Sequence, residues 1–432
     1  MNIKYSFWLG ILFFSFLYFL PQTNGQSTFE LDMDVLLKRC HADARLQSLY
    51  TAKQQLALAE YKKAKKWWWP TLYGGFTSSG LLGTAQNTDG RFFRDIRKHN
   101  LWAGLGIDAT WDLKEKYRVQ ANSWAAKALS YAKAADQEEL LLDAIEEYFT
   151  FKRGYATFFS YVRLVEKSTS IAEQYQKQVA RGLKPKSDYL IAKSRVNAMQ
   201  SKAVSAYRMM KRSEAALIAL LDLPADTEIE LTDTLYAPLS LVATKAPDWS
   251  AMLDIDPKLH QIEMQINGME AGKQALTKGR WLPKLFLNTN GSLFGGTFDP
   301  FDPTGVFRAG ALWQIPLHQL KGNADLQIAE AKIATMRASE AFIRRDRQMK
   351  LMQALQEMTN LEQQMEVAEA AKSYALEAFD LILARQQKGV ASPLELFEAE
   401  EQAVQTTIDY LHVVLDYNYA QYRYLVLTRG VK

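Results

Sequence analysis

Two carboxylates stand at matching places in two similar stretches of the sequence. Asp188 follows Gly182 by six residues, and Glu395 follows Gly389 by six residues. Each glycine is placed to end a long helix in the left-handed conformation, and each acid falls in the first turn of the next helix. A carboxylate there offsets the helix dipole. The run Ser-Pro-Leu-Glu that ends at Glu395 also has the form of a capping box with proline at the first helical position.

The other reactive side chains lack the spacing that catalysis or metal binding needs. The histidines are His41, His99, His260, His318 and His412. None of them forms a His-Glu-x-x-His motif, no phosphate-binding glycine loop with a lysine is present, and no serine sits in a nucleophile elbow. Cys40 is the only cysteine, which excludes an intrachain disulfide and a cysteine metal cluster and suggests an ordinary half-buried residue. We therefore expect no catalytic, cofactor-binding or metal-binding residues, and no enzymatic activity.

Composition places the chain among folded proteins without a nucleic-acid signature. Of its 432 residues, 48% are apolar and 23% are charged, which is the globular range. The net charge is only +4 and the basic residues are spread along the chain, so we expect no nucleic-acid partner. No internal apolar run is long enough for a transmembrane helix.

The N-terminus has the form of a secretory signal peptide. Lys4 supplies a positive charge, the apolar stretch from Phe7 to Leu20 covers about 14 residues, and Pro21 then breaks it before small residues up to Gly25. We assign residues 1–25 to this segment and expect the mature protein to leave the cytoplasm. An uncleaved anchor is the alternative.

The sequence contains two copies of one pattern. The motif Trp-Trp-Pro-Thr-Leu-Tyr from Trp68 recurs as Trp-Leu-Pro-Lys-Leu-Phe from Trp281. Trp-Asp-Leu from Trp111 is matched by Ile-Pro-Leu from Ile315, and the glycine turns described above form a third pair. The three landmarks keep nearly one spacing of roughly 210 residues, so a duplication is more plausible than chance.

Each repeat is expected to read helix, two strands, long helix, tight turn, long helix. The repeats occupy residues 26–222 and 257–432. Residues 223–256 contain three prolines and are expected to form a linker or a small irregular subdomain. The first helices are predicted near residues 29–66 and 257–279.

The predicted strands alternate between apolar and small or polar side chains. Leu101–Leu113 shows this period most clearly, residues 284–294 and 306–315 follow it, and residues 71–79 follow it poorly. A soluble sheet packed on helices has the same pattern. Strands of about 9–11 residues, however, suit a tilted bilayer crossing. Aromatic residues at the strand ends suit its interfaces: Trp67, Trp68, Trp69, Trp281 and Trp313.

Strands in lipid require partners from other copies of the chain. Four strands cannot close a barrel, and an open edge in hydrocarbon leaves backbone groups unpaired. Three copies give a twelve-stranded barrel, an even number within the range of outer-membrane barrels. Sharing follows from the physics, whereas the number three does not.

Two very long helices are predicted between the strands and the turns. Lys114 to about Ala180 and His318 to about Lys388 each span nearly 70 residues, on the order of 100 Å. Their leucine and alanine spacing is that of coiled coils or layered bundles. Helices near residues 187–221 and 393–427 return from the turns.

At this point the sequence resembles the TolC-like outer-membrane efflux proteins, over nearly all of the mature chain. The resemblance rests on the duplicated order and on these residues: Gly182, Leu183 and Asp188, the weaker copy Gly389, Val390 and Glu395, and the helix-start pairs Asp112-Leu113 and Pro316-Leu317. It implies an α+β membrane protein, a homotrimer with a periplasmic α-barrel of long helices. Each protomer would add four strands to a shared 12-stranded β-barrel in outer-membrane lipid.

The resemblance also implies partners and site residues. The helical tips would dock a periplasmic adaptor protein that works with an inner-membrane transporter, through Gly182, Leu183, Gly389 and Val390. Asp188 and Glu395 would line the periplasmic aperture, where a ring of carboxylates narrows the mouth and favours cations. The family's aspartate is a glutamate at position 395. Glycines needed only for the turns, and acids needed only at the helix starts, are the simpler alternatives.

The sequence thus predicts a passive channel-tunnel that serves as the exit duct of a tripartite efflux or export system. The exit duct of a type I protein-secretion system is one alternative. A secreted soluble coiled-coil adaptor or scaffold protein is an alternative of another class, and it would require the strands to pack on helices in water.

Overall fold

The computed structural model of the chain describes residues 28–86, 89–233, 236–241, 249–296, 300–314, 324–388 and 390–429. The predicted signal peptide (residues 1–25), Gly389, Pro316 and Leu317 lie outside the described residues.

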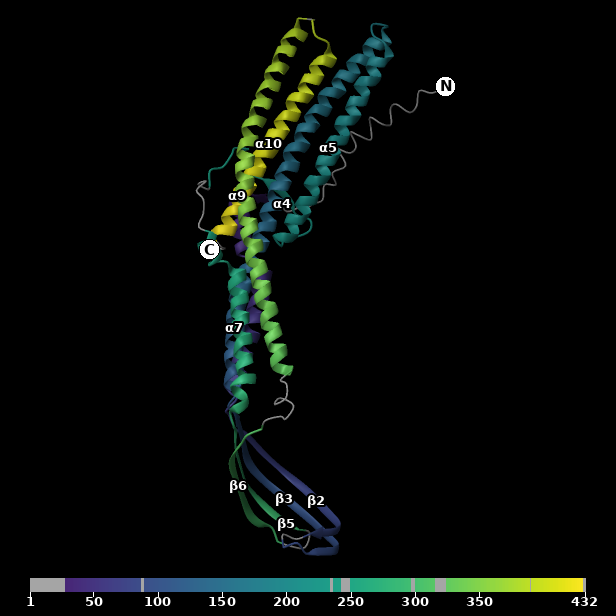
Figure 1. Ribbon diagram of the computed structural model, residues 1–432. Helices are drawn as coiled ribbons and strands as arrows, with labels where there is room; N and C mark the ends of the chain where they lie inside the picture. The colour runs from purple at the N-terminus through teal and green to yellow at the C-terminus, as the bar shows by residue number, and fades with distance from the viewer. Residues whose placement is uncertain are drawn as a thin grey trace, which may run out of the picture. The chain divides into compact units, whose positions relative to one another are not determined.

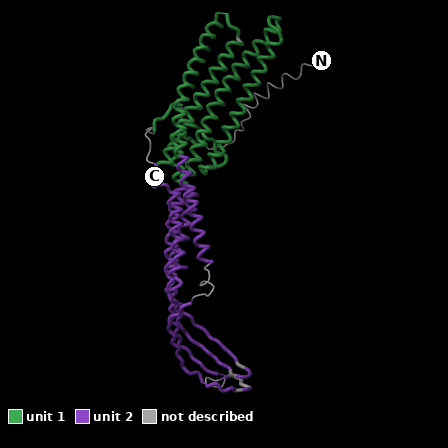
Figure 2. The backbone as a smooth tube through the Cα atoms, in the orientation of Figure 1, with its two compact units in different colours: residues 1–43, 137–246, 351–432 green, residues 44–136, 247–350 purple. Residues whose placement is uncertain are grey.

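The chain divides into two compact units, and each unit is built from segments of both predicted repeats (Figure 2). Unit 1 consists of residues 1–43, 137–246 and 351–432, and unit 2 of residues 44–136 and 247–350. Helices α4 (Glu115–Ala180) and α9 (Ala324–Gln387) contribute residues to both units. The boundaries of the two compact units therefore differ from those of the two sequence repeats.

Unit 2 contains a four-stranded antiparallel sheet in the order β2-β3-β5-β6 (Figure 1). The strands are β2 (Thr71–Gln86), β3 (Phe92–Asp112), β5 (Lys284–Gly296) and β6 (Asp302–Leu312). The first hairpin is longer than predicted, because the β2–β3 ladder continues through Gln86 and Phe92, beyond the predicted strands 71–79 and 101–113. β2 departs from regular pairing only at a bulge between Gly83 and Ala85.

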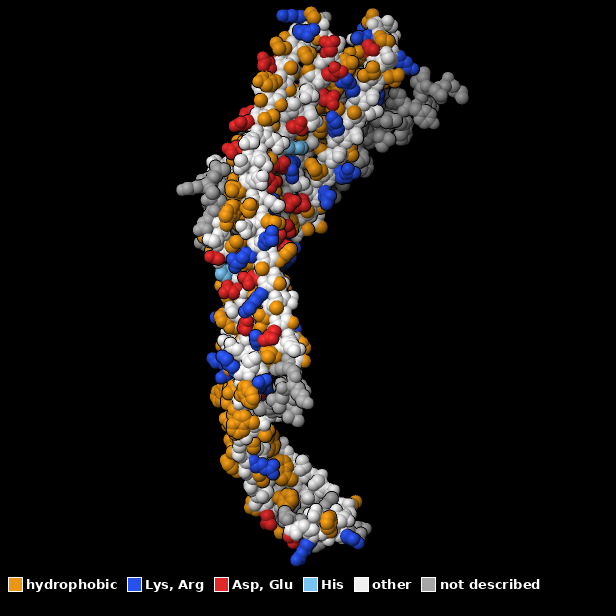
Figure 3. Space-filling view, in the orientation of Figure 1, with side chains coloured by type: hydrophobic (Ala, Val, Ile, Leu, Met, Phe, Trp, Pro, Cys, Tyr) orange, Lys and Arg blue, Asp and Glu red, His pale blue; other side chains and the backbone are white. Residues whose placement is uncertain are grey.

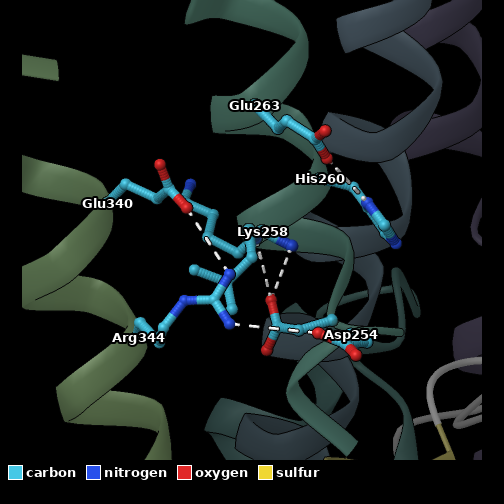
Figure 4. A network of polar contacts seen from close by, with 8 residues as sticks. Asp254, Lys258, His260, Glu263, Glu340 and Arg344 are labelled. Atoms are coloured by element: carbon cyan, nitrogen blue, oxygen red, sulfur yellow. Dashed lines mark hydrogen bonds and ion pairs between the residues drawn. The ribbon is translucent and has the colours of Figure 1, made fainter. Parts of the chain in front are cut away.

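The helices of unit 2 are α3 (Ala44–Lys65), α6 (Trp249–Leu253), α7 (Pro257–Thr277), the short helix η1 (Gly279–Trp281) and the first parts of α4 and α9. Asp256 caps α7 by accepting hydrogen bonds from the backbone of Lys258 and Leu259. The same carboxylate lies 3.0 Å from Arg347 of α9, and Arg344 lies between Glu340 and Asp254 (Figure 4). These charged contacts tie α9 to the start of α7.

Unit 1 holds the parallel pair β1 (Thr28–Leu31) and β4 (Glu228–Leu231), the helices α2 (Met33–His41), α5 (Lys186–Leu220) and α10 (Pro393–Arg429), and the remainder of α4 and α9. The single first helix predicted at residues 29–66 is wrong. A strand precedes α2 because Asp32 caps the helix by accepting from the Val35 N–H at 2.7 Å. The helical conformation is then interrupted between α2, which ends at His41, and α3, which begins at Ala44.

The core of unit 1 forms where α2, α4, α5 and the β1–β4 pair meet. Leu36, Ile145 and Leu217 are fully buried there. Cys40 is also buried, with 2% of its surface exposed, so the sequence-based expectation of a half-buried thiol is wrong. Burial raises the pKa of the Cys40 thiol to about 11, which leaves little reactive thiolate at neutral pH.

Residues 236–241 are held by two side-chain amides of α10. Asn418 accepts from the Leu239 N–H at 2.8 Å and donates to the Ala237 carbonyl at 2.9 Å. One helical turn on, Gln421 accepts from the Leu241 N–H and donates to the Leu239 carbonyl, both at 2.6 Å. The two amides therefore pair with alternate backbone groups much as a neighbouring strand would.

A row of polar contacts joins α4 to α10. Arg153 lies 2.6 Å from Asp416, and Thr157 Oγ1 lies 2.8 Å from His412 Nε2. Farther along, Tyr161 donates to Gln405 at 2.6 Å. These contacts fix α10 beside α4 within unit 1.

His412 in this row predicts an acid-sensitive contribution to stability, whereas burial raises the pKa of Asp416, which acts in the opposite direction at lower pH. Burial, and secondarily Arg153, lower the pKa of His412 below its ordinary 6.5. The folded state then binds this proton more weakly than the unfolded state, so the contribution is complete above pH 6.5 and is lost as pH falls through that value. His412→Gln should flatten the change in urea midpoint between about pH 7.5 and 5.5, followed by helical circular dichroism. An unchanged slope would assign the acid loss to other groups.

Candidate functional site: the four-stranded sheet and the helical turns

One face of the sheet is apolar across all four strands. Leu72 of β2 pairs with Ile107 of β3, and Ile107 pairs with Thr289 of β5. Thr289 pairs with Phe307 of β6, so all four share a face. Most of the large apolar side chains on this face are more than a third exposed: Leu72, Phe76, Leu82, Leu105, Ile107, Leu293 and Phe307. Leu101, Leu285 and Leu287 on the same face are half-buried. Within one described chain this face is uncovered.

The sheet is a single layer with two free edges. None of the described helices of unit 2 packs over either face (Figure 1). In the described part of the chain, β2 pairs only with β3 and β6 only with β5. The outer edges of β2 and β6 therefore present unpaired backbone groups.

The opposite face is the more polar of the two, although it also carries Trp102, Phe286 and Phe294. Asp108, Asn288 and Arg308 stand in one cross-strand row on β3, β5 and β6. Alternation between the two faces is the pattern of a sheet that meets lipid on one side and water on the other.

The same aromatic-over-glycine pair occurs in both hairpins on the polar face. Tyr73 lies across from Gly106, and a Cβ at Gly106 would meet the Tyr73 ring at 2.5 Å. Phe286 lies across from Gly310, where a Cβ would meet its ring at 2.8 Å. In each hairpin the ring covers a position that only glycine leaves open.

The predicted interface tryptophans gather at one end of the sheet. Trp67, Trp68 and Trp69 precede β2, Trp281 precedes β5 and Trp313 follows β6. Trp68, Trp69, Trp281 and Trp313 are each more than half exposed. The indole of Trp111, at the end of β3, donates to the Trp68 carbonyl at 2.6 Å. Figure 3 shows apolar side chains gathered around this end of the strands.

The turn between α4 and α5 depends on glycine. Gly182 has φ of +71°, and its N–H bonds to the Val179 carbonyl. The Leu183 N–H bonds to the Gln178 carbonyl at 2.9 Å. These two bonds form a Schellman motif. Leu183 is 70% exposed at the tip, so its side chain does not pack into the core of its own chain.

The turn between α9 and α10 repeats this arrangement in the residues described. The Val390 N–H bonds to the Arg385 carbonyl at 2.9 Å, the counterpart of the bond from Leu183. Ser392 then accepts from the Glu395 N–H at 3.2 Å, which confirms the predicted N-cap. Val390 is 67% exposed.

The two carboxylates differ in their surroundings. Asp188 lies 3.7 Å from Lys184, whose ammonium in turn lies 5.0 Å from the Tyr175 ring centroid. Glu395 is exposed beside the groove that Arg385 also lines, and among the described residues it forms no ion pair within 4 Å. Leu394 packs against the buried cluster that contains Tyr175, so both turns lie at the same end of unit 1. The described contacts do not join the two acids to each other.

Among the described residues, no group of three or more His, Cys, Asp or Glu side chains is placed to hold a metal ion. No described helix has a stretch that is both long and apolar enough to span a bilayer.

Comparison with known proteins gives a match in structure but not in sequence. No protein-family model matches the chain, and no curated protein matches it by sequence. The outer membrane channel CmeC of Campylobacter jejuni has a TM-score of 0.79 at 13% identity, over 92% of this chain and 85% of that chain. The outer membrane protein VceC of Vibrio cholerae has a TM-score of 0.75 at 15% identity, over 92% and 96%. The chain has the TolC-like fold. The open-state MtrE channel of Neisseria gonorrhoeae agrees, with a TM-score of 0.72 at 16% identity over 92% of this chain and 89% of that chain.

The TolC-like fold confirms the predicted order of strand pairs and long helical hairpins. The likeness extends over 92% of the chain for both CmeC and VceC. At these low identities it carries no residue roles.

Proposed function

We propose that the chain is one protomer of a homotrimeric outer-membrane channel, a passive exit duct rather than an enzyme. Its four strands would form a third of a shared 12-stranded β-barrel, and its long helices would form a third of an α-barrel in the periplasm. The fold and the character of its structural neighbours, which include outer membrane channels, support this proposal.

The single observation that carries it is the uncovered sheet. An apolar face in water, bounded by two unpaired edges, would aggregate. In a bilayer the same face is stable only if strands of neighbouring copies pair with β2 and β6. A soluble coiled-coil scaffold, the rival prediction, would need helices over this face, and the described chain places none there.

The proposed partners follow from the position of the turns. Leu183 and Val390 are exposed at the ends of the helical hairpins, where they could enter an apolar site on a periplasmic adaptor joined to an inner-membrane transporter. Gly182 and Gly389 would let the chain turn sharply enough to present them. The cargo would then be chosen by the transporter, because a water-filled duct has few means of selection.

The proposal is tested on the full-length protein extracted from membranes in detergent. We expect the mass of three chains per particle and single-channel conductance in planar bilayers from the same sample. A soluble monomer in the periplasmic fraction would overturn the proposal.

Neutralising Glu395 should open the periplasmic mouth. Three Glu395 carboxylates around one narrow aperture would attract cations and constrain its width. Glu395→Gln is expected to change conductance about twofold or more and to weaken cation selectivity. Asp188→Asn is the matched control, since Lys184 already offsets that charge. If conductance and selectivity both stay constant in Glu395→Gln, the residue serves only the helix start.

A further inference from the structure

The two helical hairpins of the chain correspond residue by residue. Helix α4 ends at Ala180 and α9 ends at Gln387, an offset of 207 (387 − 180). Helix α5 begins at Lys186 and α10 begins at Pro393, again an offset of 207 (393 − 186). Each position on α4 or α5 therefore has a counterpart 207 positions later on α9 or α10.

Within the chain, the groove between α4 and α5 is filled by α10. Leu394 packs against the buried cluster that contains Tyr175 and Ala192. Phe397 packs in a buried cluster that contains Leu164, and only 2% of its surface is exposed. The first hairpin thus receives two apolar side chains from the first turns of the second.

An ion pair closes this contact. Glu398, the neighbour of Phe397, pairs with Arg195 of α5. The Arg195 guanidinium carbon also lies 5.8 Å from the Phe397 ring centroid. Arg195 therefore contacts both the Glu398 carboxylate and the Phe397 ring of α10.

The corresponding groove between α9 and α10 is open in the described chain. Arg385, Glu395 and Glu398 lie along it, and the other lining residues are Ala375, Ala378, Ile382, Ala399 and Gln402. By the offset of 207, these are the counterparts of Ser168, Ile171, Tyr175, Ala192 and Arg195. The residues around the filled groove therefore recur, mostly with smaller side chains, around an empty one.

The side chains on α5 that correspond to Phe397 and Glu398 are exposed. Subtracting 207 from Phe397 and Glu398 gives Leu190 and Ile191 on α5. Leu190 is 54% exposed and Ile191 is 46% exposed, so neither fills the open groove of its own chain. The comparison of the two repeats thus finds two adjacent apolar side chains exposed and one mainly apolar groove unfilled.

We propose that Leu190 and Ile191 of one copy of the chain occupy the groove between α9 and α10 of the next copy. The proposal rests on the proposed function, since it takes the neighbour to be another copy of the same protein. The contact joins different surfaces of two identical chains, so repeating it closes a ring of three when each copy is rotated by a third of a turn, as the proposed trimer requires. In that ring the contact within each chain alternates with its counterpart between chains.

A second pair of positions supports the same register. Lys167 of α4 pairs with Glu400 of α10 within the chain. Their counterparts are Tyr374 on α9 and Lys193 on α5. Tyr374 is 72% exposed, and a lysine ammonium over a tyrosine ring is a favourable contact. The ion pair inside the chain would be replaced by a cation–π contact between chains.

The test rebuilds the internal ion pair across the interface. Ile191→Glu brings a further carboxylate to a groove that Glu395, Glu398 and Arg385 line, where Gln402 stands in place of the arginine of the filled groove. It should lower the trimer fraction in detergent about tenfold. Gln402→Arg alone should leave the trimer largely intact. The double variant restores the Glu398–Arg195 arrangement between copies and should recover most of the trimer. Both residues are exposed in the single chain, so its helical circular dichroism should be unchanged in all variants.

Cross-linking gives an independent readout. Leu190→Cys combined with Ala378→Cys should give covalent dimers and trimers with a short bismaleimide, and each single variant should give none. Cys40 can stay in place because it is buried with a raised pKa. A wild-type trimer in which Ile191→Glu has no effect, the double variant shows no rescue, or the cysteine pair stays unlinked would overturn this inference alone. A wild-type monomer would overturn the proposed function with it.

Discussion

Replacing Leu105 by arginine is expected to keep the chain out of the outer membrane. Leu105 lies near the middle of β3 on the apolar face and is 67% exposed in the single chain. An arginine facing lipid near the midplane costs about 2–4 kcal/mol in a transmembrane barrel. Three copies bring three such charges into one shared barrel, so the effect multiplies. Membrane flotation and heat-dependent migration of the trimer on gels measure the loss.

Thr110→Arg is the matched control, because Thr110 is exposed on the polar face of the same strand. That variant should still insert and should change only the conductance. If both variants insert equally well, the apolar face does not meet lipid, and the proposal of a shared transmembrane barrel is wrong.

Removing the amides of Asn418 and Gln421 is expected to release residues 236–241 and to destabilise unit 1. Asn418→Leu and Gln421→Met keep the approximate side-chain volumes but leave four hydrogen bonds unmade. Each buried backbone group left without a partner costs about 1–3 kcal/mol. The double variant should therefore unfold at a clearly lower urea concentration and become sensitive to proteolysis in this segment.

Gln363→Met on α9 provides the comparison, since that side chain is exposed. It should not move the urea midpoint. Equal midpoints for the Asn418 and Gln421 variants and the native protein would show that the segment finds other partners or contributes nothing to stability.

The sequence was most informative where a feature occurs twice or follows a strict period. The bounds of α4 and α5 were predicted within a residue or two, because Gly182 and Pro185 interrupt an otherwise unbroken helical pattern. The alternation in β3 was clear because large apolar residues occupy every second position. β2 was ambiguous, since small residues such as Gly74 and Gly80 separate Leu72, Phe76 and Leu82 on its apolar face.

What could not be predicted depends on contacts between distant segments. The β1–β4 pair joins residues far apart in the chain, and four residues of each strand carry too little pattern to be found alone. The hold of Asn418 and Gln421 on residues 236–241 was missed because amides on a helix are usually solvent-exposed. The open groove between α9 and α10 became visible only when packing in the two hairpins could be compared.

The unequal length of the two hairpins leaves part of the sheet as a ribbon. β3 pairs with β5 only from Asn100 onward, whereas residues 92–99 pair with β2 alone. If the sheet crosses the outer membrane as proposed, this ribbon stands clear of the barrel wall on the cell surface. A peptide tag placed at its turn, beside Asp89 and Gly90, would then be accessible to antibodies on intact bacteria.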